Sequence, residues 1–567
     1  MESRARSEWD SRAGAGRVAP PGPPEAASFE PRFSLGAHVA PAVAILAVTS
    51  ASLAFFYACG LTNLYGDAIA HMEGARRLTD SLTPGLAEIG SVWLPLYHFL
   101  VAPLAANFNL WRTGLGGSLV SAAALGLAAW FIFRLGSAMN RNLAAGWVAL
   151  VGFLACANML YIGSTPLTEP LCVMWAALVA WELYRFQQNG RLAILVAAAL
   201  AAFFGTLTRY DGWYLLPFAA LFVLLARPRG WRLRLRDAAW FSVIAGAGPL
   251  LWALHNWYRY GNPMEFYNGP YSAQAIYAHQ LATTGFRYPT DGSYVLSARY
   301  YLEDLKLVIG AGSLVLAVLG LVAWAADAGE RARRSAALLT LVPFVFYVQS
   351  MAHSSVPIYV PTLFPHTYYN LRYGLEMLPA AALLPSFLVS ARLPARVRTG
   401  VVAVVMAILA VQFGSRIKAG AVEIGTVKES LLNTPCHTRT AEALIDLLKR
   451  SYAGGTILMG MGKYPCVLPT LGIPYRQALT ESNRPYWTKL RLGPAGWPPG
   501  PPFTSLAWIL RTDSDPVDEL MRAYPDAFRQ FTLVETYRFP GEDTVRVYRR
   551  EPGPPSGAQE SRPEGSE

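Results

Sequence analysis

The stretch VWLPLYHFLVAPLAANF, from Val92 to Phe108, is apolar enough to be taken for a membrane span. Hydropathy does not settle whether it crosses, because the whole chain is 53% hydrophobic and only 15% charged. The basic residues settle it, since cytoplasmic loops of membrane proteins collect Arg and Lys. If the segment does not cross, every basic cluster between the other apolar runs falls on one side of the membrane. We therefore predict a juxtamembrane amphipathic helix here.

These basic clusters are short arginine-rich connections between apolar runs. They are Arg134 with Arg141, Arg185 with Arg191, RPRGWRLRLR (Arg227–Arg236), RARR (Arg331–Arg334) and RLPARVR (Arg392–Arg398). Counting Val92–Phe108 as a span would place all of them outside. Membrane orientation therefore accounts for the net charge of +11, and we expect no nucleic-acid partner.

Apolar runs of about 20 residues are typical of membrane-spanning helices. On this rule the chain is a polytopic α-helical membrane protein with about eleven transmembrane helices and a small C-terminal α/β domain outside the membrane. The expected spans are 38–60, 113–135, 144–162, 169–187, 191–208, 212–227, 238–258, 304–326, 336–352, 372–391 and 400–416.

The predicted domain organisation has four parts. Residues 1–37 are a disordered cytoplasmic leader, 38–416 the transmembrane domain with an outer loop at 61–112, 417–551 a soluble extracytoplasmic domain, and 552–567 a disordered tail. In the soluble part, strands are expected at Thr456–Met461, Ser505–Arg511 and Val545–Arg550, helices at Ala441–Arg450 and Pro516–Tyr524, and a disordered proline-rich link at Pro494–Pro502. The composition of the leader, link and tail is typical of disorder.

Four polar motifs fall together on the outer face in this topology. They are YGD (Tyr65–Asp67), TPLTEP (Thr165–Pro170), TRYDGW (Thr208–Trp213) and NLRYG (Asn370–Gly374). Ionisable groups at the membrane are costly and usually face a partner or a watery cavity. The four motifs are therefore candidates for lining one site.

Each motif also has a plain structural interpretation. Asp67 suits a helix cap, Glu169 suits the positive end of a helix macrodipole, and Arg209 with Asp211 suits an interface ion pair. A purely structural explanation is weakest for Arg372, because the positive-inside rule disfavours an arginine at the outer end of a span.

The order of these elements resembles the GT-C superfamily of integral-membrane glycosyltransferases. The likeness rests on an outer-loop aspartate followed by AR and WLPLYH, then TEP, TRYDGW and NLRYG, over residues 38–416. Within the superfamily the chain is similar to the bacterial branch of protein mannosyltransferases and aminoarabinose transferases, which depend on polyprenyl-phosphate sugars. This resemblance implies transfer of a sugar from such a lipid donor to a protein, lipid or glycan acceptor, with inversion, at the outer face of a multi-pass membrane protein. In a bacterium the membrane would be the inner one.

Such a transfer needs a base for the acceptor proton and positive charge for the departing phosphate. The resemblance assigns Asp67 as the base and Arg372 as the phosphate clamp, with Arg209 and His366 as helpers. Glu169 matches a second acid that orients the acceptor or holds a divalent cation.

Further substrate contacts are assigned to Tyr65, His71, Asp211, Tyr271 and Tyr373. Tyr271 belongs to the aromatic segment Tyr260–Gln274, which either anchors the chain at the interface or closes over the substrate.

The sequence leaves open whether the reaction uses a metal ion. Many relatives carry Asp-Glu in the first outer loop, whereas Ala68 follows Asp67 here, and Glu73 is a candidate substitute. Hard oxygen ligands would suit Mg²⁺ or Mn²⁺ if the reaction uses a metal.

The sequence leaves two alternative functions open. A secondary transporter or lipid flippase would be expected to show internal repeats with paired broken helices, and no motif has a second copy here. A glycan polymerase or ligase would use the same chemistry with a larger donor.

Cys436 and Cys466 share the C-terminal domain, while Cys59, Cys156 and Cys172 lie in or beside spans. On an oxidising side of the membrane the first two are candidates for a disulfide, provided that their Cα atoms lie within about 7 Å.

Overall fold

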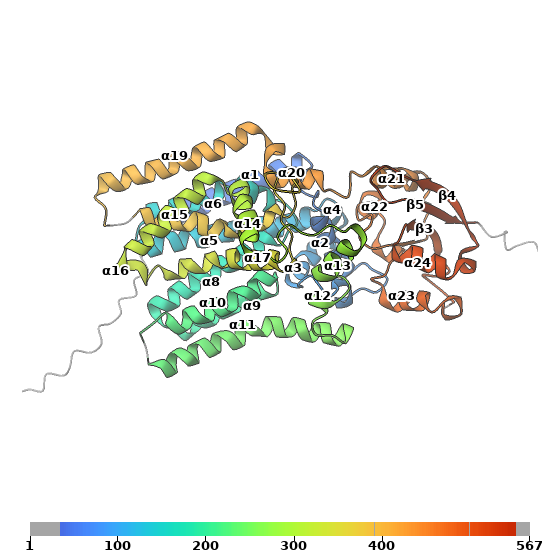
Figure 1. Cartoon of the computed structure of the whole chain (residues 1–567), viewed down its shortest axis with the longest axis horizontal. Coiled ribbons are helices and arrows are strands. Elements are labelled where there is room, and N and C mark those ends of the chain that lie inside the picture. The colour runs from blue at the N-terminus through green and yellow to red at the C-terminus, as the bar shows by residue number, and fades with distance from the viewer. Residues whose placement is uncertain (1–34, 229, 390–391, 498, 552–567) are drawn as a thin grey trace, which may run out of the picture.

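The computed structural model describes residues 35–551 except 229, 390–391 and 498. A helical bundle lies at one end of the molecule and a small α/β unit at the other, with short helices of the connecting loops between them (Figure 1). The predicted tail and all but the last three residues of the predicted leader lie outside the described residues. Those three residues begin α1, so the first helix starts slightly earlier than expected.

Every predicted span overlaps helical structure. The bundle comprises α1 (Leu35–Ala58), α5 (Leu115–Asn140), α6 (Leu143–Leu154), α7 (Ala157–Ile162), α8 (Glu169–Asn189), α9 (Leu192–Thr206), α10 (Tyr210–Leu225), α11 (Trp231–Tyr260), α14 (Tyr294–Val308), α15 (Ala311–Ala326), η2 (Ser335–Leu341), α17 (Val342–Ala352), η3 (Leu371–Met377), α18 (Leu378–Leu383), η4 (Leu384–Leu388) and α19 (Ala395–Ala419).

Length and composition qualify fewer of these helices as spans. Among the described residues, five helices are long and apolar enough to cross a membrane, or six if α14 and α15, bent by 113°, form one broken span. Others, such as α6 and α9, are apolar but shorter. The chain is thus a polytopic helical membrane protein, and the count of eleven stays a prediction.

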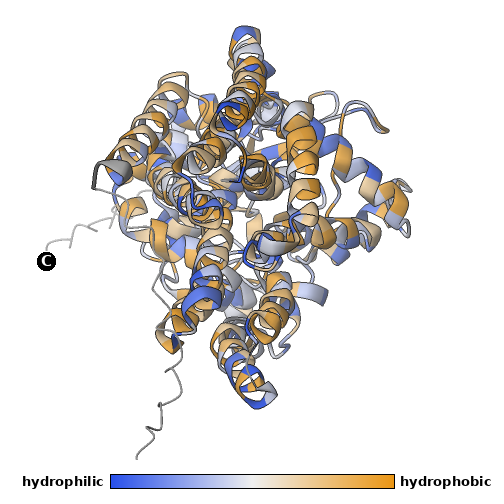
Figure 2. Ribbon diagram, turned by 90° about the vertical axis from the view of Figure 1, so that its left-hand side faces the viewer, coloured by the Kyte–Doolittle hydropathy of each residue, from blue (hydrophilic) through white to orange (hydrophobic). Residues whose placement is uncertain are grey.

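The outer surface of the bundle is apolar. Large side chains point away from the protein on three helices, with Val243 of α11 68% exposed, Val318 of α15 61% and Val411 of α19 73%. Viewed from the end opposite the sheet, hydrophobic residues are prominent on the helices around the rim (Figure 2). Such contiguous exposure is stable against lipid and unfavourable against water.

The Val92–Phe108 segment contains the short helix α3 (Leu96–Ala105). Ten residues of α-helix extend only about 15 Å, half the thickness of a bilayer core. One face of α3 is buried against the bundle, where the Tyr97 hydroxyl donates to the Gly117 carbonyl of α5 at 3.1 Å. As a single helix α3 is therefore too short to cross a bilayer, and the interfacial location of the segment stays a prediction.

Other short helices lie between the bundle and the α/β unit. They are α2 (Gly66–Arg77), η1 (Leu86–Ile89), α4 (Phe108–Arg112), α12 (Glu265–Asn268), α13 (Ala273–Thr284), η5 (Ala421–Glu423) and α20 (Gly425–Leu432), while α16 (Ala328–Arg331) lies at the far end of the bundle.

The C-terminal unit is built on a five-stranded sheet in the order β2-β1-β3-β5-β4. Strand β1 is parallel to β2 and β3, while β5 is antiparallel to β3 and β4. The elements are α21 (Arg439–Ser451), β1 (Thr456–Met459), α22 (Val467–Leu471), η6 (Tyr475–Gln477), β2 (Ala478–Leu479), α23 (Arg484–Arg491), η7 (Pro494–Gly496), β3 (Leu506–Thr512), α24 (Pro516–Ala523), η8 (Pro525–Phe528), β4 (Phe531–Tyr537) and β5 (Val545–Arg550). The three predicted strands and two predicted helices are confirmed, and β2 and β4 were not predicted.

The prediction of disorder for Pro494–Pro502 is wrong for the residues that the structure describes. Trp497 stacks on Phe503 with ring centroids 6.0 Å apart, and its indole Nε1 donates to the Leu490 carbonyl at 3.3 Å. Phe503 is 9% exposed. Packing of the buried Phe503 ring against the partly buried Trp497 ring outweighs the disorder tendency of a proline-rich composition.

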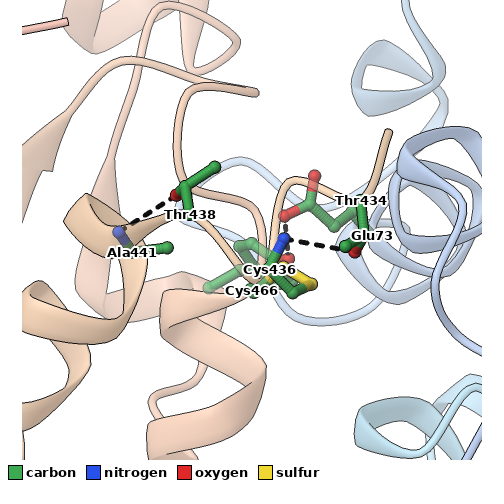
Figure 3. Close-up of a disulfide and its surroundings, with 7 residues drawn as sticks. Glu73, Thr434, Cys436, Thr438, Ala441 and Cys466 are labelled. Carbon is green, nitrogen blue, oxygen red and sulfur yellow. Dashed lines mark hydrogen bonds between the residues drawn. A yellow bond between two sulfur atoms is a disulfide. The ribbon is translucent and has the colours of Figure 1, made fainter. Parts of the chain in front are cut away.

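A disulfide joins Cys436 to Cys466, with a Cα–Cα distance of 5.5 Å. It links the segment after α20 to the residue that precedes α22 (Figure 3). The predicted pairing of these cysteines is confirmed.

Candidate active site

The four polar motifs meet at the starts of helices. Asp67 lies in the first turn of α2, Glu169 begins α8, Arg209 is the N-cap residue of α10, and Arg372 is the second residue of η3. Because carboxylates are stabilised at helix N-termini, Asp67 and Glu169 suit their positions without any ligand. Their mutual contacts decide whether they also form a site.

Arg372 connects two of these carboxylates. Its Nε donates to Glu169 Oε1 at 2.7 Å, and its Nη2 donates to Asp67 Oδ2. The arginine side chain is 5% exposed, whereas that of Asp67 is 42% exposed. Asp67 is therefore the solvent-facing end of the cluster, and the positive charge lies just beneath it.

Arg209 joins the same cluster from the other side of Glu169. Its Nη1 donates to Glu169 Oε1 at 3.1 Å, and its Nε lies 2.8 Å from Glu376 Oε1 and 3.3 Å from Asp211 Oδ2. Arg209 and Asp211 are therefore more than a simple interface pair, because Arg209 also contacts Glu169 and Glu376. Glu169 is shared by both arginines, which holds two like charges side by side.

Tyr373 lies against both guanidinium groups. The Arg372 and Arg209 Cζ atoms are 4.8 Å and 4.9 Å from its ring centroid, and Arg372 Nη2 donates to its hydroxyl at 3.2 Å. The ring stacks on Tyr347, whose hydroxyl donates to Asp211 Oδ2 at 3.2 Å. Cation–π contact stabilises a desolvated cation by about 2 kcal/mol, so the tyrosines help to keep two arginines buried.

The cluster contains two arginines and four carboxylates, those of Asp67, Glu169, Asp211 and Glu376. The second oxygen of Glu169, Oε2, is buried and has no hydrogen-bond partner among the described residues. Arginine forks bind carboxylate and phosphate oxygens with the same geometry. An incoming phosphate can thus replace a carboxylate on these arginines without a new fold.

A small, partly open cavity lies on the inner side of this cluster. Asp211 and Glu376 form its polar end, while Trp175, Val179, Ala202 and Leu339 contribute apolar walls from the bundle.

The described residues gather one set of three potential metal ligands, Cys172, Asp211 and Glu376, whose donor atoms lie within 4.8 Å of one another. A thiolate favours softer metals than Mg²⁺ or Mn²⁺, and the Arg209 guanidinium already contacts both carboxylates. Glu73, the candidate substitute acid, accepts instead from the Tyr475 hydroxyl of the C-terminal unit. The residues therefore do not form the all-oxygen site considered from the sequence, and no step below involves a metal.

His71 lies one helical turn after Asp67 on α2 but is 6% exposed. Its Nδ1 is 3.1 Å from His98 Nε2, and its ring packs on Trp93 at 4.4 Å between centroids. The contact between His71 and His98 therefore joins α2 to α3.

Two other predicted residues lie apart from the cluster. His366 is exposed and its Nδ1 is bonded to the Pro361 carbonyl at 3.1 Å, while Tyr271 is 61% exposed in the segment between α12 and α13. No contact between either side chain and the two arginines occurs within the described part of the chain. Their assignments stay predictions.

Sequence reasoning missed Glu376, Tyr347 and Glu429. Glu376 follows Arg372 by four residues and lies inside an apolar run. An acid in such a run is costly to bury, and this could have marked Glu376 as a candidate site residue. Glu429 accepts from Tyr65 and from the backbone next to Arg372. Burial raises the pKa of Glu429 to about 7, against the opposing influence of Arg372.

The neighbourhood of the cluster depends on a close approach at Gly117 of α5. A Cβ atom there would lie 2.4 Å from Pro166 Cβ and 2.8 Å from Met72 Sδ. The glycine thus lets the TPLTEP loop and α2 approach α5 together, which brings Glu169 toward Asp67.

Comparison with known proteins identifies the fold. No protein-family model and no curated protein sequence matches the chain. The crystal structure of ArnT from Cupriavidus metallidurans bound to undecaprenyl phosphate is similar, with a TM-score of 0.54 and 15% identity, over 91% of this chain and 98% of that chain. ArnT in the apo state gives a TM-score of 0.51 at 15% identity, over 89% and 98%. The expected GT-C resemblance is confirmed at the level of fold.

Proposed function

We propose that this chain, which shares the GT-C fold of ArnT, is a membrane glycosyltransferase. It moves a sugar from a polyprenyl-phosphate-type lipid to a hydroxyl, amine or amide acceptor, with inversion at the anomeric carbon. The observation that carries the proposal is the buried Arg372 directly beneath the half-exposed Asp67. A base at the solvent side and a cation behind it are the two groups that this transfer needs.

The proposed reaction follows from their positions. The acceptor attacks the anomeric carbon while Asp67 takes its proton, and the bond from that carbon to the phosphate oxygen breaks. The electron pair stays on the phosphate. Arg372 neutralises its negative charge, and Arg209 adds a second positive charge nearby. Because phosphate departs as an anion, no acid is needed for the leaving group, unlike in glycoside hydrolysis.

The side chains around the cluster are consistent with a lipid donor. The cavity beneath the cluster has apolar walls inside the bundle and a polar end at Asp211 and Glu376. ArnT has been solved with undecaprenyl phosphate bound. We propose a lipid phosphate of this class as the donor carrier here.

We place the site and the C-terminal unit on the outer face. The arginine-rich connections are then cytoplasmic, and the Cys436–Cys466 disulfide lies in an oxidising compartment. In a bacterial cell this would be the periplasmic side of the inner membrane.

The test uses purified protein in lipid bilayers with a panel of polyprenyl-phosphate sugars. The expected result is release of polyprenyl phosphate that depends on an added acceptor. If no donor in the panel is consumed and undecaprenyl phosphate does not bind, the proposal is wrong.

A further inference from the structure

Glu429 is a buried acid on α20, the short helix that follows the last long bundle helix. Its side chain is 2% exposed. Oε1 accepts from the Asn370 amide at 2.6 Å, and Oε2 accepts from the Leu371 amide at 3.0 Å and from the Tyr65 hydroxyl at 3.1 Å. A buried carboxylate costs free energy unless such donors satisfy it.

All three donors belong to segments that carry site residues. Leu371 immediately precedes Arg372, and Tyr65 lies two residues before Asp67. Glu429 therefore joins two loops that are separated by about three hundred residues and that meet at the Asp67–Arg372 pair.

The carboxylate also completes the start of η3. Asn370 is the N-cap residue of this helix, has a φ of +57°, and makes no side-chain cap hydrogen bond. The first amides of a helix need acceptors, and a negative charge there is favourable. Glu429 supplies both from a different element, so the backbone of Arg372 is fixed from outside its own segment.

Helix α20 is itself held firmly. Asn158 Oδ1 of α7 accepts from the Thr426 amide at 2.9 Å, and Ser430 Oγ is 2.7 Å from Tyr161 Oη. Seven residues beyond Glu429, Cys436 is bonded to Cys466. The carboxylate thus stands on a helix anchored to the bundle and tied covalently to the C-terminal unit.

We propose that Glu429 is a positioning residue of the transfer site, setting the position of Arg372 relative to Asp67. This inference rests on the proposed function for its effect on catalysis, while the loop contacts can be tested without it. Glu429 acts in this proposal through the backbone before Arg372 and through Tyr65.

The test compares Glu429→Gln with wild type by three measurements: amide hydrogen exchange of residues 365–377, affinity for undecaprenyl phosphate, and single-turnover transfer rate. Gln keeps the volume but presents an NH₂ group to donors that need an acceptor. We expect amide exchange at Asn370 and Leu371 to accelerate by about 10-fold or more, because local opening becomes easier. Transfer should slow by about 10- to 100-fold, as expected when a reacting group is misplaced.

The matched control is Glu423→Gln in the preceding short helix η5. Glu423 is exposed and pairs with Lys428 at 3.1 Å. This change removes one acid from the same region and should alter none of the three measurements.

Unchanged exchange in Glu429→Gln would overturn the inference, whatever the activity. Faster exchange with unchanged transfer per folded molecule would also overturn it, because the contact would then be structural alone. If Glu429→Gln does not fold, Glu429→Asp replaces it. This variant keeps the charge but is shorter by one methylene, and wild-type exchange and rate in it would overturn the inference. A wild-type protein that neither binds the lipid phosphate nor transfers sugar, with faster exchange in the variant, would refute the proposed function and leave the loop contact established.

Discussion

Arg372 and Asp67 are in contact but differ in exposure, and this difference separates their proposed roles. The guanidinium is buried between Glu169 and Asp67, whereas the Asp67 carboxylate is partly open to solvent. A buried arginine fork suits the phosphate of a lipid that is held in the bilayer. An accessible carboxylate suits an acceptor that comes from the aqueous side.

Replacing Arg372 by Ala should weaken the affinity for undecaprenyl phosphate by about 10- to 100-fold, since a charge-assisted contact contributes about 1.5–3 kcal/mol. Arg372→Lys should recover only part, because an ammonium lacks the planar fork. The Ala variant also leaves Glu169 paired with Arg209 alone and Asp67 without its arginine, so its stability should fall as well. Affinity is therefore measured per folded molecule by ligand titration.

Arg112→Ala, at an exposed arginine of α4, is the control for loss of positive charge. Equal donor affinity for the wild type, Arg112→Ala and Arg372→Ala would contradict the phosphate-binding role.

At the residue scale, much of the cluster could be predicted from the sequence. Asp67, Glu169, Arg209 and Arg372 all lie at ends of apolar runs. The predicted topology, with its basic loops on one side, puts these ends together on the opposite side. Glu429 could not be predicted, because an acid in an ordinary amphipathic segment carries no signal of its tertiary partners. The places of His366 and Tyr271 depend on loop conformations that periodicity does not specify.

At the scale of elements, the close packing of α5 against α2 and the TPLTEP loop gives a prediction. In Gly117→Ala the new methyl group would overlap Pro166 and Met72. Overpacking of this kind costs about 1–3 kcal/mol, and the displaced loop should slow transfer. Thermal unfolding and single-turnover rates measure the two effects.

Gly126→Ala provides the control on the same helix, because its nearest contact would be an ordinary 3.4 Å from Ile45 Cγ2. This change should be neutral or stabilising by up to about 1 kcal/mol, since alanine favours helix. Equal stability and rate in the two variants would contradict the packing argument.

The contact between α2 and the C-terminal unit should depend on pH. Burial raises the pKa of Glu73 to about 7 from 4.5. Because the folded-state pKa is the higher one, the protonated carboxyl contributes stability that is fully present below about pH 4.5 and is lost as pH rises through about 7. Glu73 lies beside the disulfide region (Figure 3) and bonds to Tyr475.

Glu73→Gln imitates the protonated form. The variant should match the wild type near pH 5 and exceed it in stability at pH 8 by about 1–3 kcal/mol. Denaturation at the two pH values measures this difference. A stability difference that does not change between pH 5 and 8 would show that Glu73 does not titrate in this range.

The helical elements were predictable where apolar runs are long and uninterrupted, as in α1 and α19. The breaks were not: 144–162 is two helices, and the predicted 372–391 span combines η3, α18 and η4. The second of these regions carries Arg372 in η3, so the backbone departs from a regular α-helix at the site itself. The two-residue strand β2 is too short for an alternating pattern to reveal it.

On the scale of the whole molecule, the disulfide connects the bundle's last helices to the sheet. Its loss through Cys436→Ser, or its reduction, should lower the stability of the C-terminal unit by about 3–4 kcal/mol, on the loop-entropy model for a separation of 30 residues. Thermal unfolding with and without reductant measures the change. Identical unfolding, with two thiols titrated in the unreduced protein, would show that the bond does not form in solution.

Asp67 is the proposed base of the glycosyl transfer site. The most direct measurement is the single-turnover transfer rate of Asp67→Asn together with its donor affinity. Asparagine keeps the size and hydrogen bonding of the side chain but removes its basicity. We expect a transfer rate lower by about 10²- to 10⁴-fold, with nearly unchanged donor affinity. An Asp67→Asn protein that transfers sugar at the wild-type rate would contradict this assignment.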